Sequence, residues 1–336
     1  MSDDVRDRVD AALSGFLDRI EGEWPARAPD DVIGVLRDFV LGGGKRLRPA
    51  FCCAGWRAAG GPDTGEVIVA AAALELFHAF ALIHDDIIDD SDTRRGAPAV
   101  HRRLAGRGPV FGRHAALLCG DLCAAWAEQM FHECGLPPDR IAAAHPILAR
   151  MRTEVIAGQY LDLAAAAGTV ADALQVVRLK GARYTVTRPL QIGARLAGGD
   201  DTLGDALAAF GDPLGDAFQL RDDVLGVFGD PDVTGKPALD DLREGKPTVL
   251  IALTREALPP ARRDRFELLL GDPRLDETGA AVLRGIIVAT GALSRVERMI
   301  GQRRDAALSA LEAAPVPDDV RKELSELTIS AIDRNH

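Results

Sequence analysis

Hydrophobic positions along this 336-residue chain recur at helical spacing, and the strict apolar–polar alternation of β-strands is missing. Alanine and leucine, both strong helix formers, dominate the chain. Glycine and proline pairs, such as Gly60-Gly61 and Pro137-Pro138, fall at intervals that suit helix ends. The pattern predicts an all-α fold with helices over 4–20, 30–41, 45–59, 66–89, 109–134, 139–166, 171–197, 203–227, 247–256, 260–270, 276–290, 292–313 and 317–332. No long Ser/Gly linker divides the chain, so we expect a single helical domain over residues 1–336.

The expected helix over 66–89 is apolar along almost its whole length and ends in the acidic run His84-Asp85-Asp86-Ile87-Ile88-Asp89-Asp90. A helix that is apolar all round is typically buried. Carboxylates at its C-terminal end oppose the helix dipole, at a cost of roughly a few tenths of a kcal/mol each. Asp85 and Asp89 are four residues apart and share a face. A bound Mg²⁺, which prefers oxygen ligands, would remove the cost; the alternative is a solvated, frayed helix end.

The expected helix over 203–227 follows the same plan, with Asp222 and Asp223 near its end and Gln219 one turn before Asp222. A glycine-bearing loop with Lys236 and Lys246 comes next. If the two acidic helix ends face one another, they form a cage for divalent cations. Such a cage would in turn bind a polyanion.

The use of lysine sharpens this interpretation, because only five of the 40 basic residues are lysine. Lys45, Lys236 and Lys246 each lie in a glycine-bearing turn, and a compact ammonium binds phosphate as a point charge. The turn over 42–49, GGGKRLRP, opens a helix whose backbone N–H groups attract anions. The Arg94-Arg95-Gly96 segment is close enough to fold back over the first acidic cluster. Genomic bias towards arginine is the alternative explanation for the lysine count.

Charge and composition exclude several other classes of protein. The net charge of −11 argues against a nucleic-acid partner. We expect that no apolar run approaches the ~20 residues that a membrane span needs, and the polar, acidic N-terminus is unlike a signal peptide. The five cysteines show no paired spacing and are expected to be reduced thiols. We therefore expect a cytoplasmic enzyme without a membrane span.

Five motifs, in order, show that the chain resembles the trans-isoprenyl diphosphate synthases, or polyprenyl synthetases, over roughly residues 35–255. They are GGGKRLRP (42–49), HDDIIDDSDTRRG (84–96), GQYLDL (158–163), FQLRDD (218–223) and the segment 235–246. The resemblance implies an all-α bundle around a deep central cavity, and a homodimer. It also implies Mg²⁺-dependent joining of isopentenyl diphosphate to an allylic diphosphate.

The resemblance further implies roles for individual residues. Three Mg²⁺ ions would be held by Asp85, Asp89 and Asp222, with Asp86 and Asp223 beside them. The allylic diphosphate would be bound by Arg94, Lys236 and Lys246. The diphosphate of isopentenyl diphosphate would be bound by Lys45, Arg48, His78 and Arg95. Gln219 would lie near the reacting carbon, and either Lys180 or Arg183 matches the family's mid-chain lysine, a choice that the sequence leaves open.

The second motif departs from the family pattern DDxxD, because Gly226 stands in place of its last aspartate. Asp222 remains available to bind metal, and Asp230 offers a partial substitute further along the chain. A non-catalytic regulatory subunit would lose such ligands, so Gly226 is the one feature that favours this alternative. A class I terpene cyclase would lack the two basic segments that hold a second diphosphate, and both are present.

The length of the product is expected to depend on residues below the first motif. Phe80 and Phe77 precede Asp85 by five and eight residues, or ~7.5 Å and ~12 Å along a helix axis. An aromatic ring at Phe80 beside the small Ala81 would close a channel at intermediate depth. In the family this pattern resembles synthases of geranylgeranyl diphosphate (C20), with farnesyl diphosphate or a longer product as alternatives. Both phenylalanines could also be ordinary core residues.

Overall fold

The computed structural model describes residues 3–25, 31–164, 168–229 and 239–332, which are almost wholly helical and confirm the all-α prediction. The helices of the first half are α1 (Asp3–Glu23), α2 (Asp31–Leu41), α3 (Leu47–Ala58), α4 (Gly65–Ile88), α5 (Val100–Arg103), η1 (Ala105–Arg107), α6 (Pro109–His132) and α7 (Pro138–Ala164). Those of the second half are α8 (Val170–Val176), η2 (Val177–Thr187), α9 (Arg188–Ala197), α10 (Asp201–Phe228), α12 (Asp240–Glu244), α13 (Val249–Ala257), α14 (Pro260–Leu269), α15 (Glu277–Ala289), α16 (Ala292–Ala313) and α17 (Asp318–Ile332).

The chain divides into two compact units. Unit 1 comprises Met1–Pro146 and Pro189–Gly204, and unit 2 comprises Ile147–Arg188 and Asp205–His336. The divisions fall within α7 and α10 and at the start of α9. That the whole chain forms one domain stays a prediction.

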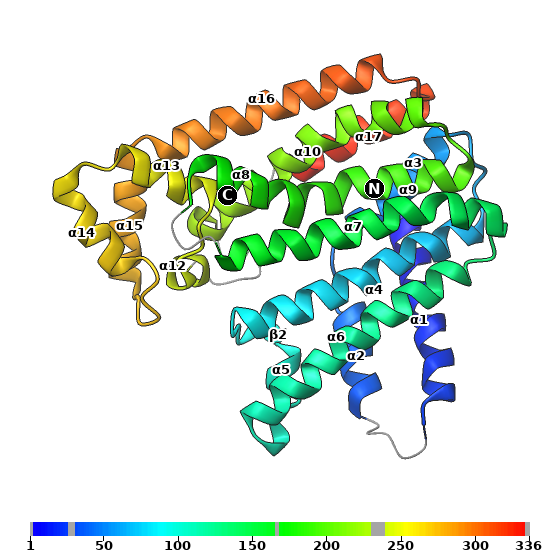
Figure 1. The fold of residues 1–336 in the computed structure, drawn as a ribbon, viewed down its shortest axis with the longest axis horizontal. Coiled ribbons are helices and arrows are strands. Elements are labelled where there is room, and N and C mark those ends of the chain that lie inside the picture. Colours follow the sequence, from blue (N-terminus) through cyan, green and yellow to red (C-terminus); the bar gives the residue numbers. More distant parts are fainter. Residues whose placement is uncertain (1–2, 26–30, 165–167, 230–238, 333–336) are drawn as a thin grey trace. The chain divides into compact units, whose positions relative to one another are not determined.

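Unit 1 is built around α4, which packs against α6, α3 and α1; Figure 1 shows α6 running beside it. Residues 70–77 of α4 are all buried. Four of them are consecutive alanines, whose small side chains let neighbouring helices approach closely. All five cysteines also lie in this unit and are buried. The burial predicted for this helix is confirmed, and it anchors the acidic end of α4 in a packed core.

The apolar character of α4 has a second consequence. Its best 18-residue window has a mean hydropathy of 2.0, so it is long and apolar enough to span a membrane, and the expectation that no such run exists was wrong. Helices α15 and α16 meet the same criterion only as a pair bent by 64°. Because 67% of the α4 window is buried inside the structure, packing within unit 1 accounts for its composition.

A short β-hairpin follows α4 and was not predicted. Strands β1 (Thr93–Arg94) and β2 (Ala97–Pro98) are antiparallel, with Arg94 opposite Ala97. The two turn residues, Arg95 and Gly96, have φ values of 55° and 75°, as a type I′ turn requires. Two-residue strands are too short to show periodicity in a sequence. The hairpin turns Arg94 and Arg95 back towards the end of α4.

Unit 2 departs from the predicted single helix over 171–197, because residues Val177–Thr187 form the π-helix η2 between α8 and α9. Its neighbours approach closely at glycines. A Cβ atom on Gly158 of α7 would lie 2.5 Å from the backbone nitrogen of Lys180, and one on Gly215 of α10 would lie 2.6 Å from the carbonyl oxygen of Ala182. π-helical turns are rare, and those that occur often lie at functional sites. This one carries Lys180.

The C-terminal part of unit 2 packs around α13, which contacts α8, α15 and α16, and α14 packs on α15. Helices α12 to α15, coloured yellow, gather at one end of this unit (Figure 1). The short α12 was also missed by the sequence pattern, because five residues do not complete two helical turns.

Candidate active site

The first acidic cluster, Asp85, Asp86 and Asp89, ends α4, and the hairpin brings Arg94 onto it. Asp86 is fully buried and accepts a 2.8 Å hydrogen bond from Nε of Arg94. Nη2 of Arg94 also binds Asp86 and lies 3.5 Å from Oδ2 of Asp85. Burial alone would lower the pKa of Arg94, but the hydrogen bond to Asp86 and the charges of Asp85 and Asp89 raise it. Arg94 therefore folds back onto the first cluster, as its short distance from Asp89 in the sequence predicted. The contact of Arg94 with an allylic diphosphate stays a prediction.

A basic group lies beside this cluster in unit 1. Nη1 of Arg95 donates a 2.7 Å hydrogen bond to the carbonyl of Gly43, which joins the hairpin to the glycine turn. The pKa of His78 is well below its usual value, because of desolvation and then of the positive charges of Arg48 and Arg95. Lys45 is exposed in the same turn. The structure therefore brings Arg48, His78 and Arg95 together, and their binding of a diphosphate stays a prediction.

Sequence reasoning missed the residue that organises this basic group. Arg46 is only 3% exposed, and its backbone is left-handed, with φ 48°. Its guanidinium donates to Asp10 of α1 (2.7 Å), to Glu75 of α4 (2.9 Å) and to the carbonyl of Val40 (2.8 Å). Oε1 of Glu75 also lies 4.0 Å from Nη1 of Arg48. A lone glutamate in an apolar helix was the signal in the sequence, because a buried carboxylate needs a cationic partner.

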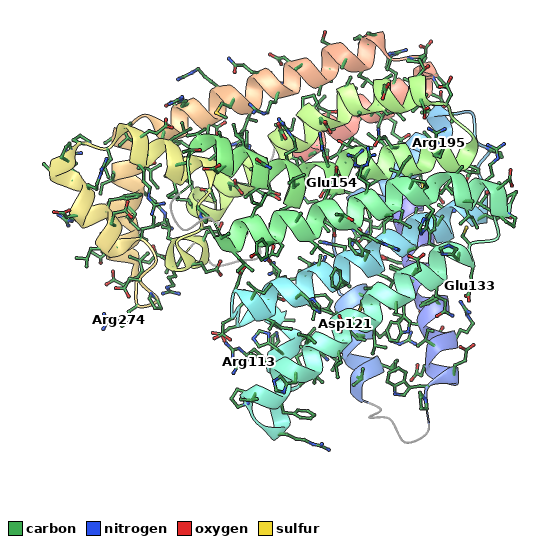
Figure 2. All side chains as sticks on the ribbon, in the orientation of Figure 1. Arg113, Asp121, Glu133, Glu154, Arg195 and Arg274 are labelled. Carbon is green, nitrogen blue, oxygen red and sulfur yellow. The ribbon has the colours of Figure 1, made fainter. Side chains whose placement is uncertain are left out.

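Aromatic rings connect α4 to α6 below the first cluster. The ring centroids of Phe77 and Phe80 are 5.1 Å apart, and those of Phe80 and His84 are 4.7 Å apart. Nε2 of His84 lies 3.1 Å from the carbonyl oxygen of Leu117 and 3.7 Å from Oδ1 of Asp121, which is labelled in Figure 2. Phe77 is buried and Phe80 is half-buried. The two phenylalanines and His84 thus form one aromatic cluster, in which the rings of Phe80 and His84 meet edge to face.

The second acidic cluster lies on α10 in unit 2. Nε2 of Gln219 donates a 3.1 Å hydrogen bond to Oδ1 of Asp223. Burial, together with the charges of Asp241 and Asp222, raises the pKa of Asp223 to about 7, although the bond from Gln219 opposes the rise. Nζ of Lys246 lies 3.6 Å from Oδ1 of Asp241. Asp241 was not among the predicted residues, and Lys236 and Asp230 lie outside the described residues.

The structure gives Lys180 and Arg183 different partners. Nζ of Lys180 lies 2.6 Å from Oδ2 of Asp162, in the GQYLDL motif of α7. Arg183 lies 3.3 Å from Oε1 of Glu154 and 3.4 Å from Oδ2 of Asp212. Glu154, labelled in Figure 2, also accepts a 2.8 Å bond from Nε of Arg188. Arg183 therefore belongs to a carboxylate network, and a contact of Lys180 with diphosphate stays a prediction.

Both acidic clusters have the chemistry that a magnesium ion needs. Asp85 and Asp89 in unit 1 and Asp222 in unit 2 offer carboxylate oxygens, the ligands that Mg²⁺ prefers. Burial, and after it the charges of Asp241 and Asp222, raise the pKa of Asp223, and a bound cation would offset both effects. The donor set of each unit therefore fits Mg²⁺.

The sequence and the fold of this chain are similar to those of known proteins. A family model described as polyprenyl synthetase matches residues 31–284. A solved structure of geranylgeranyl pyrophosphate synthase from Corynebacterium glutamicum, complexed with isoprenyl diphosphate and magnesium, is 42% identical in sequence. It covers 100% of both chains with a TM-score of 0.96.

Two further relatives are similar to this chain over almost its whole length. The geranylfarnesyl diphosphate synthase of Aeropyrum pernix is 35% identical over 324 residues, which is 94% of this chain and 98% of that protein. The geranylgeranyl diphosphate synthase of Methanosarcina mazei is 32% identical over 333 residues, which is 97% of this chain and 94% of that protein. This chain belongs to the polyprenyl synthetase family.

Proposed function

We propose that this chain is a prenyltransferase that condenses isopentenyl diphosphate with an allylic diphosphate and releases geranylgeranyl diphosphate. The observation that carries the proposal is its full-length similarity to a geranylgeranyl pyrophosphate synthase complexed with isoprenyl diphosphate and magnesium. The relatives named for geranylgeranyl and geranylfarnesyl diphosphates support the same reaction class. The order of the five sequence motifs agrees with it.

Magnesium would be held by Asp85 and Asp89 of α4 and by Asp222 of α10, and three ions per site is the number that we propose. When bound, Mg²⁺ supplies positive charge to the diphosphate leaving group. Arg94, Lys236 and Lys246 would bind the same diphosphate. Arg94 holds Asp86 in the described structure, so its guanidinium is already placed beside the first cluster.

The second substrate would be bound by the basic group of unit 1. Desolvation and the like charges of Arg46, Arg48 and Arg94 lower the pKa of Arg95, against the opposite effect of Glu75. Such a concentration of positive charge is stabilised by an anion, and the diphosphate of isopentenyl diphosphate has the matching charge. His78, kept neutral by its surroundings, can donate one hydrogen bond to it.

The reaction then follows from charge. The C–O bond of the allylic diphosphate breaks heterolytically, and its electron pair stays on the diphosphate. The double bond of isopentenyl diphosphate, held in place by its own basic group, attacks the allylic cation. A proton leaves the new product, and the departing diphosphate is its acceptor. Gln219, turned towards Asp223 on α10, is proposed to lie near the reacting carbon.

One assay tests this function. Purified protein is incubated with Mg²⁺, labelled isopentenyl diphosphate and dimethylallyl, geranyl or farnesyl diphosphate in turn, and the products are separated by chain length. We expect C20 product, and none after metal chelation. A C15 or C25 product would replace the proposed length, and C25 has a specific basis in the Aeropyrum relative. Absence of any prenyl diphosphate would favour a regulatory subunit, and a cyclic hydrocarbon would indicate a cyclase.

The length of the product gives a sharper prediction. Replacing Phe80 by alanine is expected to shift the product from C20 towards C25 and longer, because it removes the middle ring of the aromatic cluster, between Phe77 and His84. Chromatography of dephosphorylated products measures the shift. Phe77→Ala is the matched control and should lengthen the product less, since Phe77 is 3% exposed and lies deeper. An unchanged product spectrum for Phe80→Ala would show that Phe80 does not limit the chain.

We also propose that the chain is a cytoplasmic homodimer. Helix α6 exposes several large apolar side chains, namely Val110, Phe111, Leu117 and Leu118, with Leu118 61% exposed. Exposed apolar faces of this kind are typical of protein interfaces. Sedimentation analysis of the purified chain should give twice the 35.8 kDa monomer mass.

A further inference from the structure

Two histidines and a glutamate form a cluster at the corner where α6 turns into α7, within unit 1. Glu128 and His132 are four residues apart on α6, so they share one face of that helix. His145 reaches the same place from α7, two turns after that helix begins. Glu133, labelled in Figure 2, follows the last residue of α6 and marks this corner.

The three side chains converge on one carboxylate oxygen. Oε1 of Glu128 lies 3.2 Å from Nδ1 of His132 and 3.7 Å from Nε2 of His145. Each residue offers one ligand atom within 4.8 Å of the other two. In a tetrahedral zinc site with bonds of about 2.1 Å, the ligand atoms lie roughly 3.4 Å apart. The two separations from Oε1 lie on either side of that value, so a small rotation of the side chains would fit them around a zinc ion.

The cluster stands on two helices that are anchored in a core and is itself open to solvent. Phe131, beside His132 on α6, and Ala144, beside His145 on α7, are fully buried. The side chains of the cluster are 37–47% exposed, so a cation can reach them from solution. Ligands on helices are held more precisely than ligands on loops. The backbone therefore presents the three groups in a fixed arrangement.

Ordinary ion pairing does not require this arrangement. Exposed ion pairs contribute little to stability and do not need two rings around a single oxygen. The ring centroids of His132 and His145 are 5.9 Å apart, so two protonated imidazoles would also repel one another. A divalent cation binds neutral imidazole and carboxylate together. Nδ1 of His132 also lies 3.0 Å from the carbonyl oxygen of Glu128, and coordination through this nitrogen would replace that contact.

This corner is far from the proposed magnesium ligands of unit 1. A Cβ atom on Gly135, in the turn between α6 and α7, would lie 3.2 Å from Cγ of Glu66, at the start of α4. Asp85 follows Glu66 by 19 residues on the same helix, or roughly 28 Å along its axis. The donor atoms differ as well. Mg²⁺ prefers oxygen ligands, whereas imidazole nitrogen suits zinc and related transition metals.

We propose that Glu128, His132 and His145 form a structural site for a transition-metal cation, Zn²⁺ in the first place, which clamps the end of α6 to the first part of α7. The three side chains are the protein ligands, and water completes the tetrahedral coordination. Such a site is independent of prenyl transfer. A cation that binds only the folded chain stabilises it by mass action, so Zn²⁺ stabilises this corner of unit 1.

Titration of the untagged 336-residue chain with Co²⁺ and then Zn²⁺, in excess Mg²⁺, tests the proposal. The excess Mg²⁺ occupies carboxylate sites, and the visible absorption of Co²⁺ reports its ligands and geometry. We expect one Co²⁺ per chain, displaced by Zn²⁺, and a higher Tm with Zn²⁺ bound. His145→Ala should remove this rise in Tm and weaken Zn²⁺ binding by more than about 100-fold, because even the outer partners of a metal site contribute about 10–100-fold.

Matched variants make the test specific. His114→Ala removes another exposed histidine of α6 and should bind Zn²⁺ as the wild type does. Glu128→Gln keeps the side-chain shape but removes the charge, and it should weaken Zn²⁺ binding. Because the cluster is partly exposed, we expect each variant to keep the Tm of the metal-free wild type. Should His145→Ala not fold, His132→Ala decides the question.

Three outcomes would overturn the proposal. The first is a wild type that takes up neither Co²⁺ nor Zn²⁺ at one ion per chain. The second is wild-type Zn²⁺ affinity in both His132→Ala and His145→Ala. The third is loss of Zn²⁺ binding in Asp85→Asn, since this would place the zinc among the proposed magnesium ligands. Prenyl transfer by the wild type is assayed separately, and its result leaves this test unchanged.

Discussion

Replacing Asp85 by asparagine is expected to lower kcat by about 10²–10³-fold, the usual cost of removing one group that stabilises developing charge. Asparagine preserves the shape but removes the negative charge that would bind Mg²⁺. It also leaves Arg94 with Asp86 as its remaining close partner, 2.8 Å from Nε. Steady-state kinetics over a range of Mg²⁺ concentrations measure the effect, and we expect that high Mg²⁺ will not restore the rate.

Asp90→Asn provides the matched control for this experiment. Asp90 belongs to the same acidic run, but its side chain is 64% exposed and pairs with Arg102 at 3.1 Å. Its φ is 51°, a left-handed conformation that asparagine adopts readily. We expect nearly normal kcat for this variant. Equal kcat values for Asp85→Asn and the wild type would contradict the assignment of Asp85 as a metal ligand.

Replacing Glu75 by leucine is expected to produce the largest loss of stability, about 3–5 kcal/mol, because it leaves a buried cation without its buried partner. The side chains of Arg46 and Glu75 are 2% and 3% exposed and 2.9 Å apart. The pair joins α4 to the start of α3, so its loss should also raise KM for isopentenyl diphosphate through Arg48. Denaturant titration monitored by circular dichroism measures the free energy of unfolding.

Two companion variants make this prediction specific. Asp10→Asn removes the other acidic partner of Arg46. The side chain of Asp10 is 34% exposed, so this substitution should cost less than about 1 kcal/mol. Arg46→Met combined with Glu75→Leu removes both charges and should be more stable than Glu75→Leu alone. A double variant that is less stable than the single one would show that Arg46 acts through its other contacts.

The sequence predicted most helices because their apolar periodicity is long and regular. The helix expected over 66–89 is α4 over Gly65–Ile88, and the one expected over 203–227 is α10 over Asp201–Phe228. The π-helix η2 was missed, since its apolar positions look like those of an ordinary helix. Its backbone is approached closely by Gly158 and Gly215, which lie far away in sequence.

The candidate site was predictable where a motif is local and was not where the fold joins distant segments. Arg94 and Arg95 follow Asp89 closely, and the structure brings Arg94 to the first cluster. The run Lys45-Arg46 gave no indication of which residue turns inwards, because that depends on the left-handed backbone at Arg46. A Cβ atom on Gly226 of α10 would lie 1.8 Å from Oδ2 of Asp241 of α12, an approach between two helices that helical periodicity does not predict.

The glycines around η2 bear on attempts to redesign the product range. A Cβ atom on Gly181 would lie 2.2 Å from Oε1 of Gln219, and one on Gly158 would lie 2.5 Å from the backbone nitrogen of Lys180. A side chain at Gly158 would therefore displace the backbone of η2, whereas one at Gly181 would displace the side chain of Gln219. The product range is better varied at Phe80, which is half-buried in the aromatic cluster of α4 between Phe77 and His84.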